Sequence, residues 1–353
     1  MKRVFLSGLL LCASCGPQQV PPAPSSYDPS ALTGESAFRE VEQFVALGSK
    51  VPGTEGARRA ATALINRLTS LGVTAERDEF RDVTPRGTGI FVNVTATLPG
   101  AKPGLIILAA HWDTKSGIEG NGTYLSPAFE VPAAGVPASA GLSGSQPPEG
   151  GTPTVAHPEQ SLSKRHSGVE GFVGANDSGS GVGVLLALAP ILKSGTNERP
   201  SVMLAFLDGE ECQVNYGPND GLHGSRHLVA GLVASGRARA VRAMILLDMI
   251  GDRDLNVAIP RNGTPELISA VFKAAEANGT REKFSLSRQG VLDDHQPFLD
   301  VGMPAVDLID FDYGSVPGAN DYWHTPADTV DKLSPASLET VGRVVLRMLN
   351  GLY

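Results

Sequence analysis

The feature that most constrains this sequence is a set of short apolar runs that end directly in chemically active side chains. The run LIILAA (105–110) is followed by His111, the run VMLAFL (202–207) by an acidic segment that includes Glu210 and Glu211, and the run AMILL (243–247) by Asp248. Continuous apolar runs of this length are typical of strands buried on both faces of a sheet. Because such sheets bind ligands at the carboxyl ends of their strands, we expect the functional groups to gather at one edge.

Helical periodicity fills most of the sequence between the predicted strands. Apolar residues at three- and four-residue spacing predict helices over 37–47, 56–71, 181–192, 225–232, 265–277 and 335–349. Further strands are predicted at 90–98 and 305–309. Thr54 stands where it can cap the second helix. Strand–helix alternation of this kind predicts an α/β fold with a mixed, mainly parallel sheet covered on both faces, in one domain of roughly 300 residues.

The N-terminus has the organisation of a targeting segment. Lys2 and Arg3 precede an apolar run (4–11) that is too short to span a bilayer, and the run leads into two cysteines. This segment resembles a bacterial lipoprotein signal in which Cys15 is lipidated, and a plain cleaved signal peptide is the alternative. We therefore divide the chain into a signal (1–15), a Pro- and Ser-rich tether (16–35) and a catalytic domain (36–353). An exported protein is expected: periplasmic, anchored to the membrane by a lipid, or secreted.

The composition indicates which partners, cysteine chemistry and oligomeric state to expect. The net charge of −8 without a basic block argues against nucleic acid as a partner. Cys212 is the only cysteine outside the targeting segment, so the domain has no internal disulfide, and we expect Cys212 to be a small buried residue rather than a nucleophile. The Gly-, Pro- and Ser-rich segment 116–170 is interpreted as a surface insertion. No heptad or long exposed apolar stretch forces assembly, so we expect a monomer.

Five imidazole and carboxylate groups are candidates for one metal site. Asp177 lies in a Gly-rich loop that opens a predicted helix, and His324 lies in a loop after the last predicted strand. Together with His111, Glu211 and Asp248 they form the mixed nitrogen and oxygen set that suits zinc. Taken singly, each has an ordinary alternative: a structural histidine, a turn aspartate or a surface acid. Adjacent residues that leave a strand point in different directions, so Glu211 can hold a metal while Glu210 faces the substrate.

The ordered motifs resemble a known superfamily. HWDTK, GANDSGSG, DGEEC, LLDMIGD, DDHQPF and WHTPADT, together from about Val51 to the C-terminus, resemble the zinc aminopeptidase superfamily and its glutaminyl cyclase branch. The resemblance implies a three-layer α/β/α sandwich with a mixed, mainly parallel sheet. It also implies a zinc-dependent enzyme that acts on the N-terminus of peptides or proteins.

The two branches of this superfamily assign the same residues differently. In the aminopeptidases two zinc ions are bridged by the position of Asp177, with His111 and Asp248 on one ion and Glu211 and His324 on the other. In the animal-type cyclases a single zinc is held by the positions of Asp177, Glu211 and His324. There Glu210 matches the catalytic acid/base, and Asp248 and Asp293 match acids of a hydrogen-bonded network.

Several details favour the cyclase branch. Asp293 and Trp323 match cyclase residues, and the spacer between the acidic pair and GSRHL has the length found in cyclases. Against it, the segment after His324 resembles the peptidases, and Tyr216 stands where the animal cyclases have Trp. We predict a glutaminyl-peptide cyclotransferase that converts an N-terminal Gln to pyroglutamate and releases ammonia, with Trp323 and Tyr216 in the substrate pocket. The alternatives are a two-zinc aminopeptidase and a catalytically silent binding protein, and intact Glu210 argues against the latter.

Overall fold

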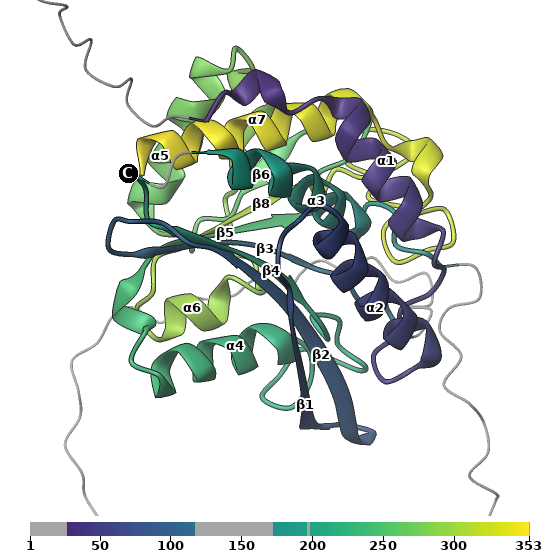
Figure 1. The fold of residues 1–353 in the computed structure, drawn as a ribbon. Coiled ribbons are helices and arrows are strands. Elements are labelled where there is room, and N and C mark those ends of the chain that lie inside the picture. Colours follow the sequence, from purple (N-terminus) through teal and green to yellow (C-terminus); the bar gives the residue numbers. More distant parts are fainter. Residues whose placement is uncertain (1–26, 117–171, 196–197, 353) are drawn as a thin grey trace, which may run out of the picture.

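The computed structural model describes residues 27–116, 172–195 and 198–352 (Figure 1). The predicted signal, Cys15, the first part of the tether and almost the whole insertion lie outside the described residues.

The centre of the molecule is a six-stranded sheet with the order β1-β2-β4-β3-β5-β8. Its strands are β1 (Glu76–Thr84), β2 (Gly87–Leu98), β3 (Leu105–His111), β4 (Ser201–Leu207), β5 (Val241–Asp248) and β8 (Ala305–Ile309). The four strands β4, β3, β5 and β8 are mutually parallel, whereas β2 pairs antiparallel with β4 and β1 antiparallel with β2. The prediction of a mixed, mainly parallel sheet is confirmed.

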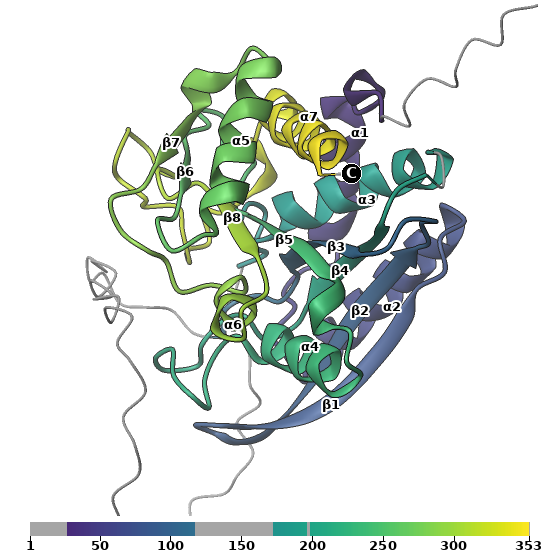
Figure 2. The same ribbon diagram turned by 90° about the vertical axis from the view of Figure 1, so that its left-hand side faces the viewer.

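Helices cover both faces of this sheet (Figures 1 and 2). One face packs against α1 (Gly34–Val45), α2 (Glu55–Ser70), α3 (Gly179–Ser194), α5 (Pro265–Ala277) and α7 (Pro335–Gly351), and the other against α4 (His223–Ala234) and α6 (Gln296–Asp300). Alternation along β3 explains the two cores, since Ile106 and Leu108 contribute to the first and Leu105 and Ile107 to the second. Each face is therefore apolar, and the predicted three-layer α/β/α sandwich is confirmed.

The sequence patterns did not predict four of the elements that the structure shows. The strand β1 is exposed along most of its length, so its sequence has no apolar pattern that would predict a strand. Its extended conformation is stabilised by pairing with β2. The strands β6 (Val257–Ile259) and β7 (Phe284–Leu286) form a small separate parallel sheet, and α6 spans five residues. Elements this short contain too few residues for a periodic pattern to be recognised.

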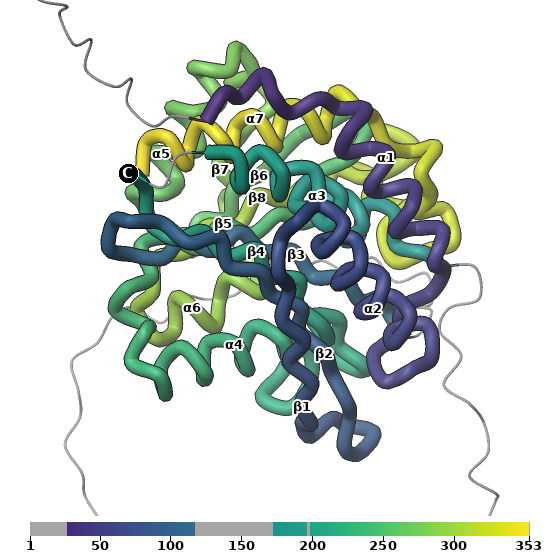
Figure 3. Tube along the Cα trace, viewed as in Figure 1, coloured from purple at the N-terminus to yellow at the C-terminus, as the bar shows by residue number. Residues whose placement is uncertain are grey.

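The folded domain begins before the predicted boundary at residue 36. Tyr27 and Leu32 are buried in the main core, and the Tyr27 backbone exchanges hydrogen bonds of 2.7 and 2.8 Å with the Asn350 side chain on α7. Figure 3 shows this first described segment running along α7, which is far from it in sequence. The last residues of the predicted tether therefore belong to the folded domain, because Tyr27 and Leu32 pack in its core. Among the helices of the described ranges, none is both long and apolar enough to cross a lipid bilayer.

Candidate metal centre and active site

Four of the predicted site residues lie at the carboxyl ends of the parallel strands, at one edge of the sheet. His111 is the last residue of β3 and Asp248 the last of β5, while Glu210 and Glu211 follow β4 after Gly209. Gly209 has a φ of 72°, and a Cβ there would meet the Phe91 ring, so a glycine lets the chain turn sharply off the strand. Because β3, β4 and β5 run in the same direction, their carboxyl ends meet at this edge.

The remaining predicted ligands come from loops. Asp177 lies just before α3, and the Asp177–Ser178 peptide bond is cis. His324 lies in the loop between β8 and the 3₁₀ turn Val330–Lys332, with a left-handed φ of 56°. Such a backbone conformation is uncommon for a residue with a Cβ and is often retained where a side chain has to be aimed.

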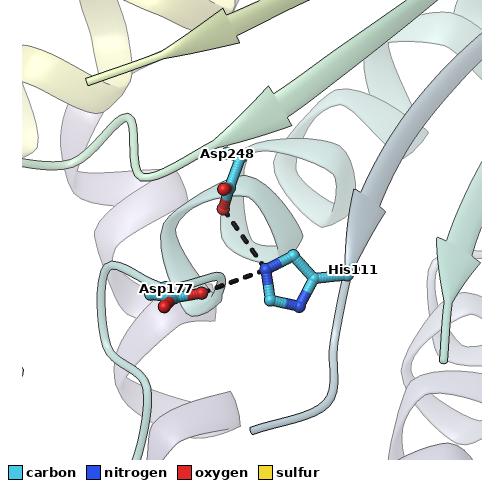
Figure 4. Close-up of side chains that lie close together, drawn as sticks. All are labelled: His111, Asp177 and Asp248. Carbon is cyan, nitrogen blue, oxygen red and sulfur yellow. Dashed lines mark ion pairs between the residues drawn. The ribbon is translucent and has the colours of Figure 1, made fainter. Parts of the chain in front are cut away.

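One group of potential ligands is formed by His111, Asp177 and Asp248. The Nε2 atom of His111 lies 3.0 Å from Oδ1 of Asp177 and 3.4 Å from Oδ1 of Asp248. Figure 4 shows the two carboxylates converging on this ring nitrogen from different elements. The pKa of His111 is subject to opposing effects: burial lowers it, but Asp113, Asp177 and Asp248 outweigh burial and raise it well above its usual value.

A second group shares Asp177 with the first. Nε2 of His324 lies 3.2 Å from Oδ2 of Asp177 and 3.1 Å from Oε1 of Glu211. The two oxygens of the Asp177 carboxylate thus face different groups, His111 through Oδ1 and His324 through Oδ2. This arrangement can hold one ion at the second group, or two ions bridged by Asp177.

The buried polar atoms of both groups fit a cation. Both carboxylate oxygens of Glu211, Oδ2 of Asp177 and Oδ1 of Asp248 are buried and accept no hydrogen bond within the described residues, although nitrogen atoms lie nearby. Burying carboxylates in this way is costly unless a positive charge compensates them. Imidazole nitrogens and carboxylate oxygens are ligands that zinc accepts, so the residues present suit the metal that the sequence predicts.

Two aspartates that the sequence analysis did not single out fix the backbone of the ligand-bearing loops. Asp113 accepts hydrogen bonds from the backbone N–H groups of Glu210 and Glu211, at 3.1 and 3.3 Å. Asp328 accepts from the backbone N–H groups of Asn176 and Asp177, at 2.7 and 3.2 Å. We call Asp113 and Asp328 the backbone clamps. Both lie within recognised motifs, but a bond to a remote N–H leaves no pattern in the sequence.

Glu210 and Glu211 have different partners: Glu211 lies beside His324 and Lys115, whereas Glu210 lies beside Tyr216. The Glu210 carboxylate accepts hydrogen bonds from the Tyr216 hydroxyl, at 2.9 Å to Oε1 and 3.1 Å to Oε2. Burial and the nearby charge of Asp293 raise the pKa of Glu210 well above its usual value. The sequence predicted both Tyr216 and Glu210 for the site, but not the bond between them.

Asp293 and Asp307 are buried and form, together with His295, a third group of potential metal ligands, whose ligand atoms lie within 4.8 Å of one another. Burial and the charge of Asp248 raise the pKa of Asp293 well above its usual value. The Nε2 atom of His295 lies 2.9 Å from the Asn262 amide nitrogen, and its Nδ1 atom lies 3.9 Å from Oδ2 of Asp307.

Trp323 and Cys212 lie beside the site. The indole of Trp323 stacks on the His324 ring with centroids 3.8 Å apart, and it meets Phe311 edge-on. Trp323 therefore packs directly against the candidate ligand His324. Cys212 is buried and not in a disulfide, as predicted, and accepts a 3.3 Å hydrogen bond from Lys115.

The chain is similar to known proteins over most of its length. The chain is 29% identical to a glutaminyl-peptide cyclotransferase-like protein of Bos taurus, over 83% of this chain and 69% of that protein. It is 27% identical to a glutaminyl-peptide cyclotransferase of Bothrops jararaca, over 85% of this chain and 78% of that protein. The crystal structure of an Acidobacteriales bacterium glutaminyl cyclase superposes with a TM-score of 0.71 at 29% identity, covering 96% of this chain and 99% of the other.

These relatives confirm the resemblance to the glutaminyl cyclase branch that the motifs indicated. The sequence profile described as peptidase family M28 matches residues 93–349, which include all five candidate ligands. By this match the chain belongs to peptidase family M28.

Proposed function

We propose that this protein is a zinc-dependent glutaminyl-peptide cyclotransferase, which converts the N-terminal Gln of peptides or proteins to pyroglutamate and releases ammonia. The observation that carries the proposal is a buried Glu210, hydrogen-bonded by the Tyr216 hydroxyl, directly before Glu211 of the candidate metal centre. The names of the relatives support the same reaction.

Asp177, Glu211 and His324 are the residues we propose to hold the metal. A zinc ion bound there would supply a Lewis acid for the γ-carbonyl of the substrate Gln. His111 and Asp248 lie on the other side of Asp177, and in a one-zinc enzyme they orient the Asp177 carboxylate and the substrate instead.

Glu210 is the proposed general acid/base. It accepts a proton from the substrate α-amino group as that nitrogen attacks the γ-carbonyl carbon, and it returns the proton to the departing ammonia. The bond that forms is the ring C–N bond of pyroglutamate, and the bond that breaks is the side-chain amide C–N bond. A raised pKa means that Glu210 takes up a proton more readily than an ordinary glutamate, which suits a group that has to accept one in the first step.

Other residues of the site bind and orient the substrate. Asp248 and Asp293 would hold the α-amino group and the leaving amide nitrogen, because a carboxyl group accepts hydrogen bonds from N–H groups whether it is ionised or protonated. Trp323 would close one side of the pocket while its stacking on His324 keeps that ring in place. Tyr216 orients the Glu210 carboxylate through its hydroxyl.

A product analysis on matched peptides tests the proposal. The purified chain is incubated with a Gln-initiated and a Leu-initiated peptide of otherwise identical sequence, and the products are weighed. We expect the Gln peptide to lose the mass of one ammonia and the Leu peptide to stay intact. Release of free Leu, without any ammonia loss from the Gln peptide, would rule the cyclase out.

A two-zinc aminopeptidase is the second candidate, because the structure forms two potential ligand groups that share Asp177. In that enzyme Glu210 would take a proton from water instead of from the substrate amine. Metal analysis separates the two: about one zinc per chain fits the cyclase and about two fit the peptidase.

We further propose that the chain is exported and that Cys15 is its lipidation site. The basis is the sequence alone, since residues 1–26 lie outside the described ranges. Mass spectrometry of the mature N-terminus from the native host tests this, and an unmodified residue other than Cys15 at that terminus would contradict it.

A further inference from the structure

Asp220 is a buried carboxylate that has no part in the proposed reaction so far. It lies in the connection between β4 and α4, with 4% of its surface exposed, and it is in none of the groups of potential metal ligands that the described residues form. Its side chain accepts hydrogen bonds from three successive backbone N–H groups, those of Gln213 at 2.6 Å, Val214 at 2.8 Å and Asn215 at 2.9 Å. Hydrogen bonds from N–H groups to a carboxylate are stronger than those between neutral groups, so the three together hold this segment firmly.

The segment that Asp220 holds is part of a loop, residues 212–221, which starts just after the acidic pair and returns to it. At its far end the Leu222 N–H donates to the Glu210 carbonyl at 2.9 Å. Within the loop, Gly217 and Asp220 exchange backbone hydrogen bonds of 3.0 and 3.2 Å. The loop contains neither a helix nor a strand, so its conformation depends on such individual bonds.

Tyr216 lies in the 212–221 loop, directly after the three residues that Asp220 binds. Its hydroxyl lies 2.9 and 3.1 Å from the two carboxylate oxygens of Glu210. Its ring packs on Gly221, where the φ is 72° and a Cβ would come within 2.5 Å of the ring. The backbone before Tyr216 is therefore held by Asp220, and the ring is seated on the glycine that follows Asp220.

We propose that Asp220 is a positioning residue for the acid/base Glu210. By binding the N–H groups of residues 213–215, it holds the loop in the conformation that brings the Tyr216 hydroxyl to the Glu210 carboxylate. Without the Asp220 carboxylate three N–H groups lose their acceptor, and the loop has no ladder of its own to replace those bonds. The effect on the reaction rests on the proposed function of Glu210, whereas the hold on the loop does not.

Hydrogen exchange on the full chain tests the hold on the loop independently of the reaction. Asp220→Asn has nearly the same shape, but it loses an acceptor oxygen and places an amide NH₂ group against a backbone N–H. We expect the peptide covering 212–222 to exchange about tenfold faster or more than in the unaltered chain, because local opening then costs less free energy. Peptides from β4 should exchange as before. An unchanged rate for the 212–222 peptide would overturn the proposal.

Asp220→Ser covers the case in which Asp220→Asn does not fold. The short hydroxyl side chain removes the carboxylate without placing an amide NH₂ group against the backbone N–H groups. The same acceleration of the 212–222 peptide is expected, and its absence counts against the proposal in the same way.

A double-mutant cycle with Tyr216→Phe shows whether Asp220 acts through the Tyr216 hydroxyl. We expect Asp220→Asn to lower kcat on a Gln-initiated peptide by about tenfold, and by no more than Tyr216→Phe does, because one hydrogen bond to Glu210 is all that the loop supplies. In the Tyr216→Phe background, Asp220→Asn should change kcat by less than about twofold. A single variant with the kcat of the unaltered chain, or losses that multiply in the double variant, would overturn a role through Tyr216.

Asn350 provides the matched control, because its side chain also holds backbone by hydrogen bonds. It binds the N–H and the carbonyl of Tyr27, whose ring lies beside Arg199, just before β4 and at the other end of that strand from the site. Asn350→Ala should lower thermal stability and leave kcat and the 212–222 peptide unchanged. An equal loss of kcat in Asn350→Ala would assign the effect of Asp220 to stability alone and overturn the proposal.

The same measurements distinguish failure of this inference from failure of the proposed function. If the cyclase proposal is wrong, the unaltered chain forms no pyroglutamate, yet Asp220→Asn still accelerates exchange of the 212–222 peptide. If Asp220 does not position the loop, pyroglutamate forms and exchange is unchanged.

Discussion

At the scale of single residues, the site depends on two neighbouring glutamates with different surroundings. Glu211 faces His324 and Lys115, whereas Glu210 faces the Tyr216 hydroxyl. Asp113 accepts hydrogen bonds from the backbone N–H groups of both, so one side chain holds the backbone of both glutamates. One acid can therefore serve a metal while its neighbour remains available for proton transfer.

Replacing Glu210 by Gln tests this division of roles. The amide cannot accept and return a proton, so kcat should fall by about 10²–10⁴-fold, the usual contribution of a general acid/base. Zinc content should stay at the level of the unaltered chain, because Glu210 is not among the potential metal-ligand groups found in the described residues. Loss of zinc together with activity would show that Glu210 is a ligand rather than the acid/base.

Replacing Tyr216 by Phe removes the hydrogen bond to Glu210 and little else. A hydrogen bond to a charged group contributes about 1.5–3 kcal/mol, so kcat should fall by roughly 10–100-fold if the bond orients Glu210 during the reaction. Steady-state kinetics on a Gln-initiated peptide provides the measurement, with zinc content as the control. An unchanged kcat with a raised KM would instead assign Tyr216 to substrate binding alone.

At the scale of elements, α3 determines where Asp177 lies. The helix is buried along almost its whole length and packs on the sheet through small residues near its start. A Cβ at Gly181 would occupy the space of the Leu247 carbonyl oxygen on β5 and would come within 2.9 Å of the Ala110 methyl group on β3. The glycine therefore lets the helix start approach the strand ends closely, which brings Asp177 to His111.

Replacing Gly181 by Ala should push the start of α3 away from the sheet. Overpacking of this kind typically costs about 1–3 kcal/mol, and we expect weaker zinc binding in addition to lower stability. Gly231→Ala in α4 is the matched control, since a Cβ there meets no atom within 4 Å, and it should stabilise the protein by about 0.5–1 kcal/mol. Thermal melts and zinc titrations of both variants check this; equal zinc affinity in the two would separate helix packing from the site.

At the scale of the whole molecule, the site concentrates negative charge in the interior. Glu210, Glu211, Asp177, Asp248 and Asp293 are all less than 7% exposed. Such groups destabilise the fold when ionised without a partner, so a bound cation should stabilise the native state more than the unfolded chain.

Removing the metal should therefore lower the melting temperature. Zinc at about 100 times its dissociation constant would add about 2.7 kcal/mol, which corresponds to roughly 4–5 °C for a domain of this size. Calorimetry before and after chelation, and again after zinc is restored, measures the difference. Identical melting curves in all three states would contradict a zinc site assembled from these residues.

The sequence by itself determined the architecture and the identity of the candidate site residues. Apolar runs specify strands buried on both faces, and the residues that end them are brought to one edge because parallel strands share a direction. The observed strand β8 and helix α5 have the predicted bounds, and the two predicted ligand groups are assembled from His111, Asp177, Glu211, Asp248 and His324. Strands, helices and the residues at their ends can be predicted because each depends on the pattern within a single short segment of the sequence.

Only the tertiary structure decided how these residues are held. The bonds of the clamps Asp113 and Asp328 and the Tyr216–Glu210 bond are contacts between a side chain and another part of the chain, most of them with segments far away in sequence. The same is true of β1, which is exposed and ordered by its partner strand, and of Tyr27, which is anchored by α7. The periodicity of a sequence records which side of an element is buried, but the partner of a polar group is fixed only when the elements have packed.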